Sequence, residues 1–166
     1  MDPALMRKLV LALAVVGVAA LGYNWFSSGP QPRLEGKITG VRLLEVEPEA
    51  SILLVNFEVE NITNLPFVAH ERWLEIVDAE GDAHQGTTVN GVDMKPLFQY
   101  FAAELGGMKD EPFIAMTTID PGEVERGLLA ARFEMSKAQL EARKEIILRI
   151  VDGVRRETQI RQLSQN

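Results

Sequence analysis

The chain has 166 residues, 46% hydrophobic and 25% charged, which is typical of one folded domain with or without an appendage. Its net charge of −7 argues against nucleic acid as a partner, because binding nucleic acid requires a basic surface. The absence of cysteine excludes disulfides, thiolate metal sites, a cysteine nucleophile and a lipidated N-terminal cysteine.

The N-terminal segment is apolar from Leu9 to Phe26, interrupted only by glycines and Asn24. These 18 residues would reach about 27 Å as a helix, close to the ~30 Å of a bilayer's hydrocarbon core. The length predicts a single transmembrane helix within residues 1–26. The alternative is a cleavable signal peptide, since small residues between Val18 and Gly22 offer plausible cleavage sites.

The flanks of this segment indicate its orientation. Arg7 and Lys8 precede it, and the positive-inside rule places such a pair in the cytoplasm. Tyr23, Trp25 and Phe26 cluster at the far end, where aromatic rings prefer the lipid headgroup layer. We expect a single-pass signal-anchor in a bacterial inner membrane, with the lipid bilayer as its partner. The folded domain would then lie in the periplasm or outside, and the alternative is secretion after cleavage.

A short linker at residues 27–33, rich in Ser, Gly and Pro, should keep the domain close to the membrane. The clearest strand follows at Ser51–Asn61. Its odd-numbered positions from 53 to 59 are apolar and its even-numbered positions from 56 to 60 are polar, which predicts one dry and one wet face. The dry face would hold Leu53, Val55, Phe57 and Val59, and the wet face Asn56, Glu58 and Glu60.

Further strands are predicted wherever apolar runs end at turn signals. They cover residues 37–46 with a bulge near Gly40, then 68–77, a weak polar edge at 83–89, 113–119, 124–135 and 145–151. Asp152-Gly153 could turn the last strand into a weak return strand. Ser136 is positioned to cap a short helix through Arg143. Seven or eight strands with these turns predict an all-β sandwich.

One helix interrupts this pattern, at Pro96–Leu105. Pro suits its first turn and Gly106-Gly107 its end. Two interpretations remain open. The helix could cover the sandwich with Leu97, Phe101 and Leu105, or it could present exposed aromatics to a protein partner. The candidate partner-binding residues are Phe98, Tyr100 and Phe101.

No motif for catalysis or phosphate binding is present. His70 and His84 could approach each other across the sheet, but they lack metal-ligand spacing and are interpreted as surface residues. Asn61-Ile62-Thr63 matches a glycosylation acceptor and is interpreted as a turn. We therefore expect no catalytic residue, no cofactor and no metal site.

Several stretches resemble a known family. A strand ends in Asn61-Ile-Thr, a second closes in Leu74-Glu-Ile-Val-Asp-Ala-Glu-Gly81, and Pro121-Gly122-Glu precedes Gly127-Leu-Leu-Ala-Ala-Arg-Phe-Glu134. Over roughly Leu34 to Val151 the chain resembles the telokin-like, immunoglobulin-like domains tethered outside the bacterial plasma membrane, many of unassigned function. The resemblance implies a membrane-tethered sandwich with a structural or binding role. It offers no catalytic residues, and the helix departs from its pattern.

We thus expect an anchor at residues 1–26, a linker at 27–33, an immunoglobulin-like β-sandwich at 34–160 and a tail at 161–166. The expected function is that of a non-catalytic, membrane-anchored extracytoplasmic interaction or accessory domain, such as a single-span subunit of a larger membrane complex. The alternative is a periplasmic domain that binds a small ligand or a metal in a pocket between the helix and the sheet.

Overall fold

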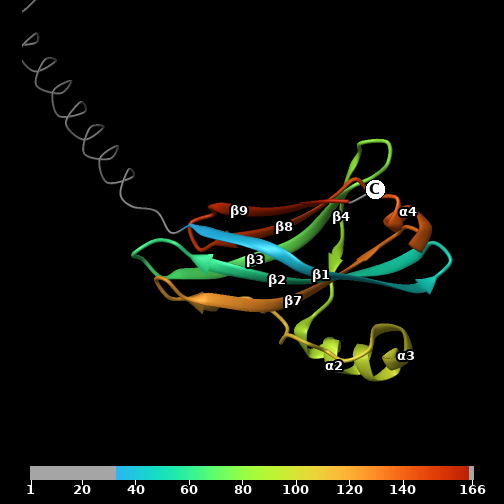
Figure 1. Ribbon diagram of the computed structural model, residues 1–166, viewed down its shortest axis with the longest axis horizontal. Helices are drawn as coiled ribbons and strands as arrows, with labels where there is room; N and C mark the ends of the chain where they lie inside the picture. Colours follow the sequence, from blue (N-terminus) through green and yellow to red (C-terminus); the bar gives the residue numbers. More distant parts are fainter. Residues whose placement is uncertain (1–32, 165–166) are drawn as a thin grey trace, which may run out of the picture. The chain divides into compact units, whose positions relative to one another are not determined.

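The structure, a computed structural model, describes residues 33–164. They form two antiparallel sheets packed as a sandwich, with short helices at its periphery (Figure 1). The strands are β1 (Leu34–Glu47), β2 (Ala50–Asn61), β3 (Phe67–Val77), β4 (Ala83–Gln85), β5 (Thr87–Thr88), β6 (Thr117–Ile119), β7 (Val124–Phe133), β8 (Glu145–Asp152) and β9 (Glu157–Leu163). The helices are α2 (Gly91–Tyr100), α3 (Ala102–Leu105) and α4 (Lys137–Glu141).

The predicted anchor, with Arg7, Lys8, Tyr23, Trp25 and Phe26, lies outside the described residues, as does most of the predicted linker. Within residues 33–164, none of the helices combines the length and the apolar character needed to cross a membrane.

The first sheet has the strand order β1-β2-β7-β5. The second has the order β4-β3-β8-β9, with β6 pairing to the start of β3. Each sheet therefore contains strands from both halves of the chain, and β1 also packs beside β9 at one seam of the sandwich. The predicted all-β sandwich is confirmed at this level.

The main core lies between the two sheets. β2 contributes Leu53, Val55, Phe57 and Val59, all fully buried, as the alternation of its sequence predicts. The inward faces of β7, β3 and β8 complete this core with, among others, Leu129, Ala131, Phe133, Leu74, Ile76, Leu148 and Ile150.

The predicted wet face of β2 is exposed at Glu60 and partly exposed at Glu58, but the prediction is wrong at Asn56, which is buried. Ile52, Leu54 and Asn56 point away from the main core and are also buried. They are buried because α2 and α3 pack against the outer face of the first sheet, below β7 in Figure 1. A second apolar cluster results, formed by Leu44, Ile52, Leu54, Met94, Phe98, Leu105, Leu128 and Ala130.

The helix predicted at Pro96–Leu105 begins earlier and is broken. Asn90 caps α2, accepting a hydrogen bond from the backbone of Val92, so Pro96 lies inside the helix instead of in its first turn. α2 ends at Tyr100, and Phe101, with φ −108° and ψ 37°, separates it from α3. Burial against the sheet sustains this helix despite the backbone donor that Pro96 lacks.

The predicted edge strand at 83–89 is two strands on different sheets. β4 pairs with β3, and β5 pairs with β7. The chain crosses between the sheets at Gly86, whose amide donates to the carbonyl of Leu74. A side chain there would lie 2.7 Å from the ring of Phe133, so the crossing requires glycine.

The predicted strand at 113–119 is also shorter, since only β6 pairs with β3. Ahead of it, Phe113 donates its amide to Leu128 and lies against Phe57 with ring centroids 5.2 Å apart. Arg72 Nε donates to the carbonyl of Phe113 at 2.9 Å, which ties this segment to the second sheet.

Near the C-terminus, Ser136 caps α4, as predicted, although α4 ends at Glu141 rather than Arg143. Gln139 completes a capping box with Ser136. β9 reaches Leu163, so the sandwich extends beyond the boundary expected at residue 160. Ile160 of β9 is buried in the main core, so the return strand packs into the sandwich.

Candidate functional site

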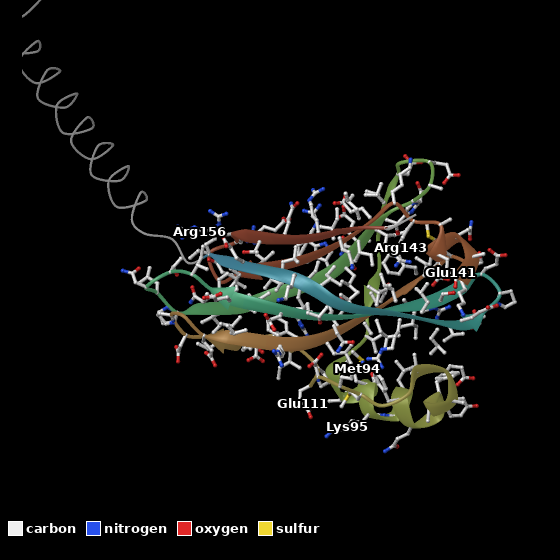
Figure 2. The ribbon with its side chains drawn as sticks, viewed as in Figure 1. Met94, Lys95, Glu111, Glu141, Arg143 and Arg156 are labelled. Carbon is white, nitrogen blue, oxygen red and sulfur yellow. The ribbon has the colours of Figure 1, made fainter. Side chains whose placement is uncertain are left out.

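The outer face of the first sheet is divided into an apolar part and a charged part. The apolar part lies under α2 and α3, which we call the helical insert (residues 91–105). Met94 points from α2 toward the sheet and Lys95 away from it (Figure 2). Beyond the insert, the outward side chains of β1, β2 and β7 include Lys37, Glu58 and Arg126, with Val124 as an exposed apolar exception.

A β-bulge in β1 determines which side chains reach the charged part. The pairing of β1 with β2 shifts between Ile38 and Gly40, leaving Thr39 as the extra residue. Regular alternation would place Lys37 and Arg42 on opposite faces. Because of the bulge both face outward, Lys37 opposite Glu58 and Arg42 opposite Leu54.

Lys37, Glu58 and Arg126 form a row of charges across the three strands. Glu58 lies opposite Lys37 on one side and Arg126 on the other. Its carboxylate is 3.3 Å from Lys37 Nζ and 3.0 Å from Arg126 Nε. Hydrogen bonds from Arg126 and then Lys37 lower the pKa of Glu58. The row thus holds one carboxylate between two cations.

Arg42 fastens the end of the helical insert to the sheet. Its Nη1 donates to the carbonyls of Leu105 at 2.9 Å and Gly107 at 3.0 Å. Its guanidinium carbon lies 4.8 Å from the centre of the Phe98 ring, within range of a cation–π contact. Burial lowers the pKa of Arg42, and the nearby charge of Asp110 opposes this shift.

Asn56 connects Arg42 to Asp110. Arg42 Nη2 donates to Asn56 Oδ1 at 3.1 Å, and Asn56 Nδ2 donates to Asp110 Oδ2 at 2.5 Å. The buried amide therefore uses both its oxygen and its nitrogen, which fixes the loop 106–110 in place.

An open cleft of about 650 Å³ lies between this loop and the charged row. Its floor comes from β1, β2 and β7, and its wall from Leu105 to Asp110. The charged residues that line it are Lys37, Arg42, Lys109, Arg126, Glu58 and Asp110. This volume falls within the range of small-molecule sites, so the cleft is the candidate functional site.

The three predicted partner-binding residues differ in exposure. Phe98 is only 6% exposed and anchors the insert on the sheet. Tyr100 is 83% exposed. Phe101 is half-buried and packs edge to face with Tyr100 at 4.8 Å between ring centroids. Only Tyr100 thus presents its ring fully to solvent, and none of the three lines the cleft.

Other residues singled out in the sequence stabilise turns or pair with neighbours. Asn61 is buried and donates to the carbonyls of Leu65 and Ile119, so it organises a turn, as predicted. His84 does not approach His70. It contacts Asp78 Oδ2 at 2.7 Å, while Asp78 Oδ1 accepts three backbone amides of the β3–β4 turn.

The sequence did not identify several residues that line the cleft. These residues are Lys37, Arg42, Asn56, Lys109, Asp110 and Arg126. The bulge near Gly40 was a usable signal, because an extra residue changes the side-chain parity. Gly106-Gly107, predicted only as a helix end, marks the wall of the cleft. Lys109 and Arg126 carry no local pattern that would bring them together.

Comparisons with known proteins do not identify a family for this chain. No protein-family model matches the chain, and no curated protein is similar to it in sequence. A solved structure of a conserved hypothetical protein from Bacillus anthracis is similar, with 17% identity and a TM-score of 0.39 over 78% of this chain and 89% of that one. A structural-genomics target is similar with 12% identity and a TM-score of 0.35 over 82% and 88%. Nothing about activity follows from likenesses at this level.

The residues that line the cleft determine what it can bind. It offers cationic donors from three elements, and both of its carboxylates already have partners. Across residues 33–164, histidine, aspartate and glutamate side chains nowhere gather in a group of three or more that could hold a metal ion. This arrangement of cationic donors is suited to binding a ligand.

Proposed function

We propose that this chain is a non-catalytic, membrane-anchored extracytoplasmic domain that binds a protein partner through its helical insert. The anchor and the orientation rest on the apolar run and its flanking residues. The binding role rests on Tyr100, whose ring stands 83% exposed at the end of a helix. Tyr, with Trp and Arg, is enriched among the residues that contribute most of the binding energy near the centre of protein interfaces.

The strand order supports an immunoglobulin-like sandwich. Such domains place strands A, B, E and D on one sheet and C, F and G on the other. Assigning β1, β2, β7 and β5 to the first set and β3, β8 and β9 to the second reproduces this order, with β4 as an added edge strand. The helical insert then lies between strands D and E.

The insert is held rigidly enough to present Tyr100. Met94, Phe98 and Leu105 are buried against the first sheet, and Arg42 bonds the carbonyl at its end. Val92, 75% exposed at the start of the same helix, adds a second apolar side chain on the solvent side. A partner would therefore meet a preformed surface.

The test extracts the full-length protein from its native membrane in mild detergent. We expect an intact mass that includes residues 1–26 and a stoichiometric companion protein. Tyr100→Asp should lose that companion. The matched control is Gln99→Asp, which adds the same charge at the neighbouring exposed position without removing a ring, and should keep it.

Two results would contradict the proposal. One is a monomer that retains no companion from its own membrane. The other is a Tyr100→Asp protein that still binds the companion as well as the Gln99→Asp control. A mass that begins near Leu21 or Tyr23 would instead indicate cleavage and a secreted domain.

A small-ligand role is the second candidate, favoured by the cleft beside the insert. The apolar contact between insert and sheet is filled by Phe98, Met94 and Leu105, so a pocket directly beneath the helix is not supported. The space lies next to it, above the row of Lys37, Glu58 and Arg126.

A further inference from the structure

We propose that this cleft binds a phosphate-type oxyanion. The inference goes beyond the protein-binding role of Tyr100, which lies outside the cleft. It rests on an excess of cations that the fold gathers from separate elements.

The charge balance of the cleft is opposite to that of the protein. Four cations line it, Lys37, Arg42, Lys109 and Arg126, against two carboxylates, Glu58 and Asp110. The difference of two positive charges occurs in a chain whose net charge is −7. Such a local inversion attracts anions that the rest of the surface repels.

Both carboxylates already have partners. Glu58 pairs with Lys37 and Arg126, and Asp110 accepts from the amide of Asn56. Lys109 makes no ion pair within residues 33–164. Arg126 bonds Glu58 through Nε. Its two Nη nitrogens make no hydrogen bond to the described part of the chain, so they remain able to donate.

The main role of Arg42 in the cleft is to position its wall. Three of its hydrogen bonds go to the carbonyls of Leu105 and Gly107 and to Asn56, so it holds the wall carrying Lys109 at a fixed place over the floor. A preformed site of this kind spends less free energy on ordering when the ligand binds.

The distribution of donors favours a tetrahedral anion. Lys37 comes from β1, Arg126 from β7 and Lys109 from the loop after α3. Donors from three directions match oxygens that point in several directions, as in phosphate. Guanidinium and ammonium groups both form charge-assisted hydrogen bonds with such oxygens.

The outer face of the second sheet has no such excess of cations. There Arg149 pairs with Glu75 and Glu157, and Arg161 pairs with Glu145. These cations are neutralised by carboxylates on neighbouring strands, so they leave no comparable demand for an anion.

The experiment titrates the isotope-labelled full chain with inorganic phosphate at constant ionic strength and follows amide chemical shifts. We expect saturable shifts concentrated at residues 37–42 and 105–110. Lys109→Glu should raise the dissociation constant at least about tenfold, because it replaces a charged donor with a carboxylate that repels the anion. Lys109→Gln should raise it less.

The matched control is Lys95→Glu, the same charge change on an exposed lysine of the insert that does not line the cleft. Its dissociation constant should equal that of the unchanged protein. Equal weakening by Lys95→Glu and Lys109→Glu would overturn the site.

The phosphate could be free or part of a lipid headgroup. The full chain in nanodiscs of phosphatidylcholine, with and without phosphatidylglycerol, distinguishes these sources. Shifts at residues 37–42 and 105–110 that require phosphatidylglycerol assign the headgroup, and shifts with inorganic phosphate alone assign a free anion. If neither probe shifts these amides, the proposal is wrong.

Discussion

Gly127 lies where two phenylalanine rings meet inside the sandwich. A side chain there would come within 2.8 Å of both Phe57 and Phe113, whose rings pack edge to face. We expect Gly127→Ala to lower the free energy of unfolding by about 1–3 kcal/mol, because the packed rings cannot move apart without strain.

Urea unfolding of the variant measures this loss. Gly107→Ala is the control, since nothing lies within 4 Å of the added carbon there. If Gly127→Ala unfolds at the same urea concentration as Gly107→Ala, the rings yield more easily than their packing indicates.

Asp78, in the turn between β3 and β4, should make the free energy of unfolding depend on pH. The hydrogen bond from His84, followed by those from backbone amides, lowers the pKa of Asp78 below its ordinary value of 3.8. A carboxyl with a lowered folded-state pKa stabilises the fold fully above its unfolded value and loses that contribution as the pH falls through the folded one.

Asp78→Asn keeps an oxygen for the backbone amides but removes this titration. Urea midpoints measured from pH 7 down to pH 2 should therefore fall less steeply below about pH 4 in the variant. Parallel curves for the two proteins would show that His84 does not stabilise the ionised carboxylate.

At the scale of elements, the helical insert depends on Arg42. The guanidinium donates to two carbonyls at the end of the insert and to Asn56 on β2. Replacing it by Met leaves these acceptors without their charged donor, which costs roughly 1.5–3 kcal/mol.

We expect Arg42→Met to speed hydrogen exchange at amides of residues 91–110 while exchange in the main core stays slow. Arg126→Met is the control, because Arg126 makes an exposed ion pair of small energetic value. Equal exchange in the two variants would mean that the apolar contacts alone hold the insert.

The insert also shows where prediction from sequence succeeds and fails. The alternation at Leu53, Val55 and Phe57 identified the inward face of β2 correctly, because the core imposes a period of two. The same pattern could not reveal that Ile52 and Leu54 are buried too, since their cover comes from residues about 40 positions later in the chain.

The sequence contains a signal for the start of α2, but Pro96 offers a competing signal for a later start. Asn90 with Asp93 in the first turn is a helix-start signal, whereas Pro96 is equally typical of a first turn. A start at Pro96 places the first residue of the helix later than the observed Gly91. Met94 is then left out of the helix, and its alignment with Phe98 on the buried face goes unrecognised. The exposed position of Tyr100 was among the predicted alternatives.

At the scale of the whole molecule, β9 completes the sandwich. It pairs along β8 and places Ile160 in the core, next to the edge of β1. We expect a chain that ends at Asp152 to lose its cooperative thermal unfolding transition, because β8 and the core are then exposed along one side.

A chain that ends at Leu163 should unfold at the temperature of the full protein, as measured by circular dichroism. If the chain ending at Asp152 retained that same transition, β9 would be an appendage to the fold. The cleft, by contrast, could not be predicted at this scale, because its cations converge only after β1, β7 and the loop 106–110 are placed together.

The bulge at Thr39 constrains how β1 can change in length. Deleting that residue would remove the bulge and leave an even number of steps between Lys37 and Arg42, so regular alternation would keep both facing outward and Ile38 facing the core. Adding one more residue beside the bulge would instead turn the preceding part of the strand over, so that Lys37 pointed into the core and Ile38 into solvent. The space inside is already filled, since a carbon added at Gly36 would lie 2.5 Å from the carbonyl of Glu58. We therefore expect β1 to tolerate the loss of Thr39 and to reject a single insertion before Arg42.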